Sequence, residues 1–434
     1  MRHLASASLM AVLALTACVS TGPSTQAVSE PFTIAVIPDT QNYLDYTRQQ
    51  AEGFALDGKR LFITQMKEIA AREEVVFVAA VGDVWQHTSI AVDPAHEARG
   101  KGAMANPLLD AGLQPTPKTR SFEIPGAIEG YQILSASGKP FGVAPGNHDY
   151  DAVWSMVGFP PRLDRPREEL DAKAGEKGVI HVGGLDNFRS VFGEKSDFFA
   201  DRDWYVDSFR GGANSAQVFH AGGYPFLHIT LEMSPDNYVL QWASTVIEDH
   251  PGYPTIITTH DYLNTRGERR AYPVIDLAAA DPDHHNSAEK VWDRLISAYD
   301  QIFIVLCGHH HGQSLRVDDN RYGNPVFQIL ADYQGRGQAG LDAGQPQKDD
   351  GSVVGLGDGW YRLMHFDLGE QSPHIRVETW SSHYRSLSSD LATYAQWYRD
   401  YEQPDMTDGE FHAADEFTIK LDGFHERFAR VRLQ

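Results

Sequence analysis

The chain has 434 residues, 42% of them apolar and 11% aromatic, which is enough to build the core of a globular protein and excludes a disordered one. Acidic residues outnumber basic ones by 59 to 37, and the formal net charge is −22. Because a chain this acidic repels polyanions at long range, we expect no non-specific binding of nucleic acid.

The first 17 residues have the proportions of a secretory signal peptide. Arg2 precedes an apolar stretch, residues 4–15, that is too short to span a bilayer. The segment ends in Leu-Thr-Ala-Cys, which resembles the lipobox of bacterial lipoproteins. This resemblance implies that residues 1–17 are removed and that Cys18 is acylated. We therefore expect an exported protein held on a membrane by lipid on Cys18, with its domain in the periplasm or at the cell surface.

The residues around this cysteine refine the expectation. Val19 follows Cys18 where an Asp would signal retention in the inner membrane, so the outer membrane is favoured. The alternative is an ordinary secretory signal with a chance cysteine. Residues 18–31 are rich in Ser, Thr, Gly and Pro and are interpreted as a lipidated start and a flexible tether. Only Cys307 then remains unmodified, so we expect no intrachain disulfide.

Apolar runs and helical periodicity alternate along the rest of the chain. We predict strands at 33–37, 75–81, 140–144, 226–231, 255–259 and 302–307, and helices at 60–72, 238–248 and 288–299. Residues 416–422 alternate apolar and polar side chains, as a half-buried edge strand does. Strands alternating with helices predict a layered α/β domain.

We interpret residues 32–434 as one domain with a C-terminal elaboration, residues 386–434. Segments 88–125, 160–186 and 334–359 are rich in Gly, Pro or charge and show little periodicity. Loops of this length are commonly the rims of functional sites or mobile segments. We expect these loops to set any specificity that the domain has.

Polar clusters follow several of the predicted strands. They are Asp39-Thr40-Gln41, Gly82-Asp83, Gly146-Asn147-His148-Asp149, His260-Asp261 and Gly308-His309-His310-His311. In open α/β sheets ligands bind beyond the carboxyl ends of the strands, and glycine lets the backbone turn sharply there. A lone His or Asp at a strand end is more often a capping residue, but so many clusters in one chain predict a metal centre. If the segment after Gly308 is extended, His309 and His311 share one face and His310 points away.

In this order the clusters resemble those of the calcineurin-like metallophosphoesterases, over about residues 32–384. The resemblance implies an α/β fold of two packed mixed β-sheets flanked by helices. It also implies two divalent metal ions, one held by Asp39, Gln41, Asp83 and His311 and the other by Asp83, Asn147, His260 and His309. A carboxylate shared between the ions reduces their repulsion, and a hydroxide bridging them attacks phosphorus.

Further roles follow from the same resemblance. His148 would donate to the phosphoryl oxygens or the leaving group, with Asp149 orienting its ring. Gln41 departs from the commoner His of the family, and an amide oxygen is a harder and weaker ligand than imidazole. We therefore expect the metal ion at that position to tilt toward Mn, Fe or Mg and to bind less tightly. Gln41 itself stays open as a ligand, a weak ligand or a neighbour of a ligand.

The expected function is hydrolysis of a small phosphate ester, with phosphomonoesters preferred. A phosphodiesterase or pyrophosphatase is the first alternative. The second is a non-catalytic lipoprotein that binds phosphate-bearing ligands at a degenerate metal site. His87, Tyr150, Asp261, Tyr262 and Arg336 could contact substrate, or could serve as packing, hydrogen-bonding or surface ion-pair residues.

Overall fold

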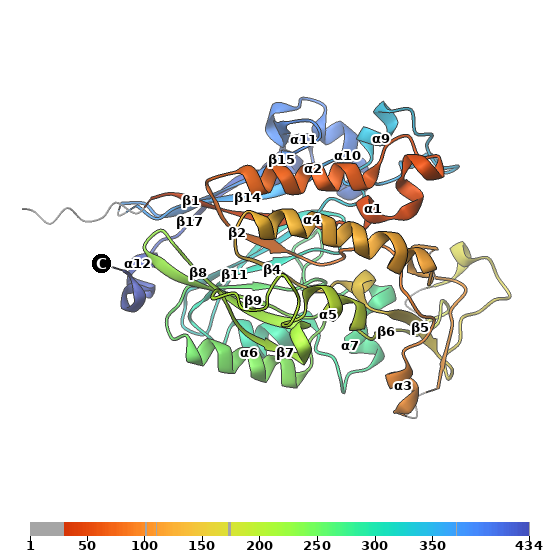
Figure 1. Ribbon diagram of the computed structural model, residues 1–434, viewed down its shortest axis with the longest axis horizontal. Coiled ribbons are helices and arrows are strands. Elements are labelled where there is room, and N and C mark those ends of the chain that lie inside the picture. The colour runs from red at the N-terminus through yellow and green to blue at the C-terminus, as the bar shows by residue number, and fades with distance from the viewer. Residues whose placement is uncertain (1–29, 100–101, 110, 172–174, 370, 434) are drawn as a thin grey trace, which may run out of the picture.

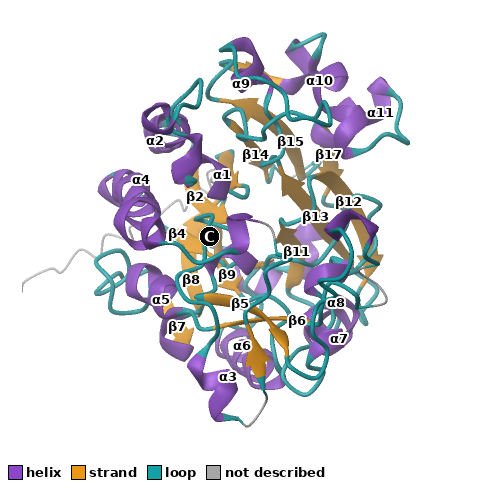
Figure 2. Ribbon diagram, turned by 90° about the vertical axis from the view of Figure 1, so that its right-hand side faces the viewer, coloured by secondary structure: helices purple, strands orange, loops and turns teal. Residues whose placement is uncertain are grey.

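Two mixed β-sheets of seven strands each pack face to face at the centre of the chain, and helices cover their outer faces (Figures 1 and 2). The computed structural model describes residues 30–433, apart from 100–101, 110, 172–174 and 370. This arrangement confirms the predicted α/β fold. The predicted signal peptide and most of the tether, residues 1–29, lie outside the described residues.

The first sheet has the strand order β16-β15-β14-β1-β2-β4, and β17 pairs with β15. Its strands are β1 (Phe32–Ile37), β2 (Val75–Ala80), β4 (Phe141–Val143), β14 (Trp360–Asp367), β15 (His374–Ser381), β16 (Ser386–Leu387) and β17 (Phe417–Lys420). β1, β2 and β4 run parallel, whereas β14 and β15 are antiparallel neighbours. β17 is the edge strand that the alternating pattern predicts.

The second sheet has the order β12-β13-β11-β10-β9-β8-β7. Its strands are β7 (Tyr205–Phe209), β8 (Asn214–Ala221), β9 (Tyr224–Thr230), β10 (Thr255–Thr258), β11 (Ile302–Cys307), β12 (Gly312–Asp319) and β13 (Pro325–Asp332). The predicted strands of both sheets are found within about two residues of their expected bounds. A small third sheet, β3 (Ala103–Met104), β5 (Ala152–Met156) and β6 (Ile180–Gly183), takes two of its strands from segments expected to be loops.

Amphipathic helices bury their apolar faces on the two sheets. α2 (Gly58–Ala71) and α4 (Ile124–Ala136) cover the first sheet, and α6 (Asn237–Asp249) and α8 (Ala288–Val291) cover the second. The predicted helix at 288–299 is divided between α8 and a π-helical turn, Trp292–Ile296. The remaining helices are α1 (Gln41–Leu44), α3 (Pro94–Ala98), α5 (Asp186–Phe192), α7 (Leu277–Ala280), α9 (Gln338–Asp342), α10 (Tyr394–Glu402), α11 (Asp408–Asp415) and α12 (Phe424–Arg427). Within the described part of the chain, no helix has the length and apolar character needed to cross a bilayer.

The C-terminal segment is an integral part of this fold. α10 and α11 lie beside β14 and β15 (Figure 2), and Tyr394, Tyr398 and Phe411 share a core with Tyr333 and Trp360. β17 extends the first sheet. Residues 386–434 therefore complete the core of the domain as well as elaborating it.

His228 on β9 is buried between the two sheets. Its ring nitrogens lie 2.8 Å from Oε1 of Gln217 and 2.8 Å from Oγ1 of Thr258, and the ring packs against Phe77 of the opposite sheet. Burial lowers the pKa of His228 to about 3. The ring is therefore neutral in the folded chain at pH values where an ordinary histidine is charged.

This burial predicts a loss of stability in acid. The unfolded chain binds a proton at His228 near pH 6.5, so the stabilising contribution is complete above that pH and falls as the pH drops towards 3. At pH 5 this effect lowers the unfolding free energy by about 2 kcal/mol relative to its value above pH 6.5. Urea titrations at pH 7.5 and pH 5 measure how much unfolding free energy each protein loses between these pH values. We expect this loss to be about 2 kcal/mol smaller in His228→Gln than in the wild type, because glutamine does not titrate. An identical pH dependence in the two proteins would contradict this account.

Candidate metal centre

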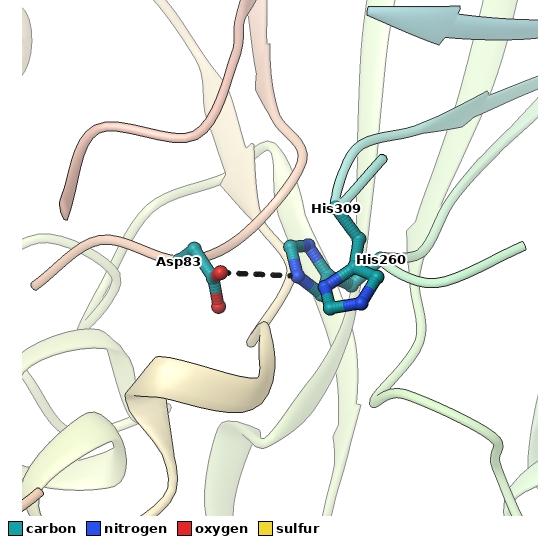
Figure 3. Close-up of side chains that lie close together, drawn as sticks. All are labelled: Asp83, His260 and His309. Atoms are coloured by element: carbon teal, nitrogen blue, oxygen red, sulfur yellow. Dashed lines mark ion pairs between the residues drawn. The ribbon is translucent and has the colours of Figure 1, made fainter. Parts of the chain in front are cut away.

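The polar clusters meet where strands of both sheets end. Nε2 of His260 lies 3.3 Å from Oδ2 of Asp83, 3.1 Å from Oδ1 of Asn147 and 4.0 Å from Oδ2 of Asp39. One ligand atom each of Asp83, His260 and His309 falls within 4.8 Å of the others (Figure 3). The structure therefore assembles these predicted ligands, which come from five different segments, into one group.

Gln41 joins this group through its amide nitrogen. Nε2 of Gln41 donates to Oδ2 of Asp83 at 3.1 Å and to Oε1 of Gln334. Gln334 in turn donates its own Nε2 to Oδ2 of Asp332 at 3.2 Å. The oxygens of Asp332 accept from Gln334, so these hydrogen bonds fix the orientation of both amides. The carbonyl oxygen of Gln41 is left without a hydrogen-bond partner among the described residues.

His311 lies at the edge of the group. It lines the same cavity as His309, and its Nδ1 is 3.0 Å from the hydroxyl of Tyr401. The predicted alternation of the three histidines is wrong, because His309 has φ +73° and the segment is not extended. His310 consequently also faces the cavity, with Nε2 3.1 Å from Oδ1 of Asp261.

Glycines allow the ligand loops to approach so closely. A Cβ atom added at Gly308 would lie 2.1 Å from Oδ1 of Asp39, and one at Gly146 would lie 2.2 Å from Oδ1 of Asp83. Asp83 itself has φ +52°, a conformation that side-chain-bearing residues adopt at a cost of about 1–3 kcal/mol. Packing of the surrounding strands maintains this strain at the site.

Burial governs the charges of the group. Burial, reinforced by Asp332, raises the pKa of Asp39 well above its usual value. Burial also opposes ionisation of Asp83, but His260 and His148 more than offset it and hold the pKa of Asp83 below its usual value. The same carboxylate raises the pKa of His260 against the effect of burial. Burial lowers the pKa of His309 to about 3, so this ring is neutral and available as a ligand.

Several buried atoms of the candidate ligands have no hydrogen-bond partner among the described residues. They are Oδ1 of Asp39, Oε1 of Gln41 and Nδ1 of His309. A buried polar atom without a partner costs about 1–3 kcal/mol, so such atoms in one small group need an explanation. Carboxylate, amide and imidazole atoms are the donors that divalent metal ions take from proteins. This donor set therefore fits divalent metal ions.

His148 and Asp149 differ from their predicted relationship. The carboxylate of Asp149 accepts the backbone N–H groups of Val84 at 2.9 Å and Gly146 at 2.8 Å, so it ties two ligand loops together. Nδ1 of His148 instead contacts the backbone carbonyl of Gln86, which orients the ring. The expectation that Asp149 orients His148 is therefore corrected. Burial, with a contribution from Asp83, raises the pKa of Asp149 to about 8.

The sequence left the role of several residues open, and the structure places some of them in the site and others in the core. Asp261 lies in the site, whereas Tyr262 is buried and donates its hydroxyl to Oε1 of Gln328 at 3.0 Å. Tyr150 is also buried. His87 contacts Glu123 at 2.7 Å and so has a structural hydrogen bond. Asp45, His87 and Glu123 form a second compact group, but Arg48 and backbone N–H groups already satisfy its carboxylates.

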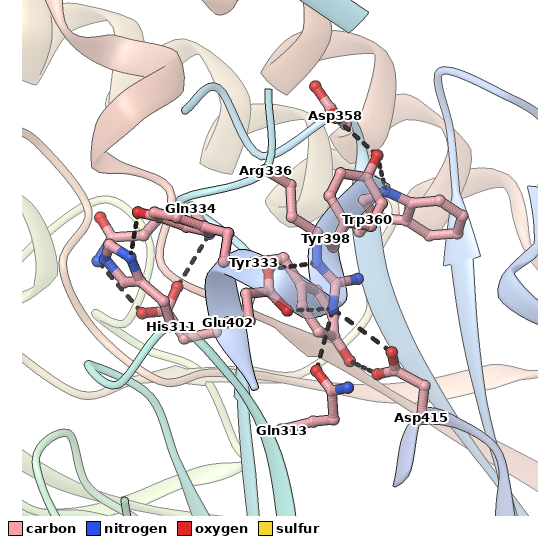
Figure 4. Close-up of polar contacts among 12 residues, drawn as sticks. His311, Gln313, Tyr333, Gln334, Arg336, Asp358, Trp360, Tyr398, Glu402 and Asp415 are labelled. Atoms are coloured by element: carbon pink, nitrogen blue, oxygen red, sulfur yellow. Dashed lines mark hydrogen bonds and ion pairs between the residues drawn. The ribbon is translucent and has the colours of Figure 1, made fainter. Parts of the chain in front are cut away.

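Arg336 is neither a phosphate contact nor a surface residue. It is completely buried and forms an ion pair with Glu402, at 2.8 Å from Nε to Oε1 (Figure 4). Glu402 lines the same cavity as His309, and Arg336 does not. Nη2 of Arg336 also donates to Gln313 at 3.0 Å. This network holds α10, which carries Tyr401 to His311. The C-terminal segment therefore supplies part of the site, and the sequence contained no motif that pointed to it.

A cavity of about 550 Å³ opens beside the group. Its metal-site end is lined by Asp83, Asn147, His148, His309, His310 and His311. The long segments 88–125, 160–186 and 334–359 all contribute to its walls. The cavity is large enough for a small organic ester to reach the candidate ligands.

Comparison with known proteins assigns no activity. No family model matches the chain. The chain is similar to the uncharacterized protein YvnB of Bacillus subtilis (strain 168), with 24% identity over 298 residues. The match covers 67% of this chain and 17% of the relative, so the chain spans a small part of that protein's length.

The glycine contacts predict that Gly308→Ala damages the site. The added methyl group would overlap the Asp39 carboxylate, so we expect a loss of about 2 kcal/mol in unfolding free energy and a lower content of bound metal. Gly409→Ala is the matched control, because its Cβ meets open space within α11. Thermal unfolding and elemental analysis of both variants test this. Equal stability and metal content in Gly308→Ala and Gly409→Ala would contradict the close packing described.

Proposed function

We propose that the chain is a phosphoesterase of the calcineurin-like class, which hydrolyses small phosphate esters with two divalent metal ions, drawn from Mn, Fe, Zn and Mg. The observation that carries this proposal is the set of unpartnered buried atoms of Asp39, Gln41 and His309, which adjoin the Asp83–His260 pair. Their order along the chain is that of the family's ligand motifs. The proposed ligands are Asp39, Gln41, Asp83, Asn147, His260, His309 and His311.

The two ions would polarise the phosphoryl group and lower the pKa of a bound water. The chain's own residues bind and orient the substrate. His148 is held by the carbonyl of Gln86, so Nδ1 carries a proton and Nε2 is the atom left for the cavity. In its charged form His148 can donate from Nε2 to a phosphoryl or leaving-group oxygen.

Local charge supports an anionic substrate despite the acidic composition. Two divalent ions bring four positive charges, and the carboxylates of Asp39 and Asp83 remove two of them. The remaining charge attracts a phosphate ester, and the doubly charged monoester more strongly than a diester. Phosphomonoesters are therefore the preferred substrates of this proposal.

The same proposal includes the location of the protein. The Leu-Thr-Ala-Cys segment supports export and acylation of Cys18, with the domain tethered to a bacterial membrane, the outer membrane being favoured. The substrate would then be a small phosphorylated molecule outside the cytoplasm.

Metal content tests the proposal directly. We expect two ions per chain after reconstitution of the domain with Mn or Zn, and loss of both metal binding and hydrolysis in Asp83→Ala, because Asp83 contacts both groups of ligands. Asp350→Ala, at an exposed position, is the control. Elemental analysis and an aryl phosphate assay measure the outcome. Retained hydrolysis in Asp83→Ala would exclude this mechanism, and one ion or none in the wild type would favour phosphate binding without turnover.

The hydrogen bond between the side-chain amides of Gln41 and Gln334 predicts that the effects of substituting them on metal affinity are coupled. Gln334→Leu removes the acceptor that orients the Gln41 amide, so we expect metal affinity to fall about tenfold or more, as for other residues that support a ligand. In a Gln41→His background the same substitution should have little effect, because imidazole has no amide to orient. Metal titrations of the four proteins test this. An equal loss in both backgrounds would mean that Gln334 acts only on general packing.

A further inference from the structure

Besides the candidate ligands, the cavity has a second part with a different lining. This part has the side chains of Leu108, Leu109, Ile180 and Ile275, together with the cations Arg167 and Lys177. Tyr272 connects the two parts, because its ring lies 5.7 Å from that of His309 and 5.9 Å from that of His310. One cavity therefore offers a ligand the candidate metal ligands, apolar side chains and positive charge.

Asn106 joins the loops that form this second part. It is buried, and its Nδ2 donates to Oγ of Ser155 at 2.7 Å and to the carbonyl of Lys177 at 2.8 Å. Its Oδ1 accepts the N–H of Leu108 at 2.8 Å. One side chain thus fixes the backbone beside the apolar wall and the backbone beside the cation. The second part of the cavity is a built surface rather than a chance gap between loops.

The charge of Lys177 is available to a ligand in this part of the cavity. Lys177 forms no ion pair with the residues that the structure describes. The carboxylates that line the cavity lie elsewhere: Asp83 belongs to the candidate ligands, and Glu402 is paired with Arg336. In a chain of net charge −22, a cation held at a cavity wall without a carboxylate partner is suited to an anionic ligand.

We propose that this cavity takes phosphate esters whose leaving group is apolar next to the ester oxygen and carries a second anionic group, a carboxylate or a phosphate, which Lys177 binds. The part of this proposal that concerns the phosphate ester rests on the proposed function. The apolar walls exclude water from the middle of the ligand, and Arg167 lines the same cavity. The proposal thereby distinguishes the substrate from a simple alkyl or sugar phosphate.

Binding of phosphonates tests the proposal without turnover. The probes are benzylphosphonate, 4-carboxybenzylphosphonate and 4-(2-carboxyethyl)benzylphosphonate, titrated into the metal-loaded chain in a calorimeter. We expect at least one carboxylated probe to bind the wild type about tenfold more tightly than benzylphosphonate, the size of one charge-assisted hydrogen bond. In Lys177→Gln this advantage should fall below about twofold, and Lys177→Arg should keep most of it.

Lys195→Gln is the matched control, since it makes the same change in net charge at an exposed side chain away from the cavity. It should retain the full advantage. The proposal is overturned if no carboxylated probe binds more tightly than benzylphosphonate, if none of the probes binds, or if Lys177→Gln keeps the advantage.

The corresponding aryl phosphates separate this proposal from the proposed function. Lys177-dependent binding of the phosphonates without cleavage of the esters would contradict the phosphoesterase activity and leave the cavity assignment standing. Cleavage of the esters without any preference for the carboxylated member would contradict the cavity assignment alone.

Discussion

The contact between Asp83 and His260 is the interaction on which the candidate site depends, because it joins the two sheets. Asp83 follows β2 of the first sheet and His260 follows β10 of the second. Nδ1 of His260 also lies 2.9 Å from the carbonyl of Val81, again across the interface. The backbone carbonyl of Asp83 accepts the N–H groups of Thr40 and Gln41, which fixes the loop after β1. The site is therefore held by the packing of the whole sandwich, and each sheet supplies only part of it.

The positions of the strand-end ligands could be predicted from the sequence because two simple rules coincide there. Buried strands appear as apolar runs, and parallel strands deliver their following residues to one edge. Asp39, Asp83 and His260 each follow such a run directly, so their convergence needed no further information. Asp332 is the last residue of the buried strand β13 and was missed, although its place at the end of an apolar run could have identified it.

Other features of the site could not be predicted in this manner, because they depend on contacts distant in the chain. Gln41 and Gln334 are in contact although they are 293 residues apart in the chain. Tyr401 reaches His311 from a helix whose position depends on the buried Arg336. The conformation of His309 was also inaccessible, because a positive φ at a side-chain-bearing residue is imposed by its surroundings. Local pattern thus identified the candidate ligands, and tertiary packing decided how they are oriented.

The amide at position 41 has a consequence for acid conditions. An imidazole in this place would have to lose its proton before it could bind a metal ion, so protons and metal would compete for it. The carbonyl oxygen of Gln41, directed by the neighbouring amide of Gln334, takes up no proton in the range where histidine titrates. A centre built with Gln41 has one fewer protonation step coupled to metal uptake than one built with histidine. In the proposed centre, glutamine in place of histidine at position 41 would exchange ligand strength for tolerance of acid.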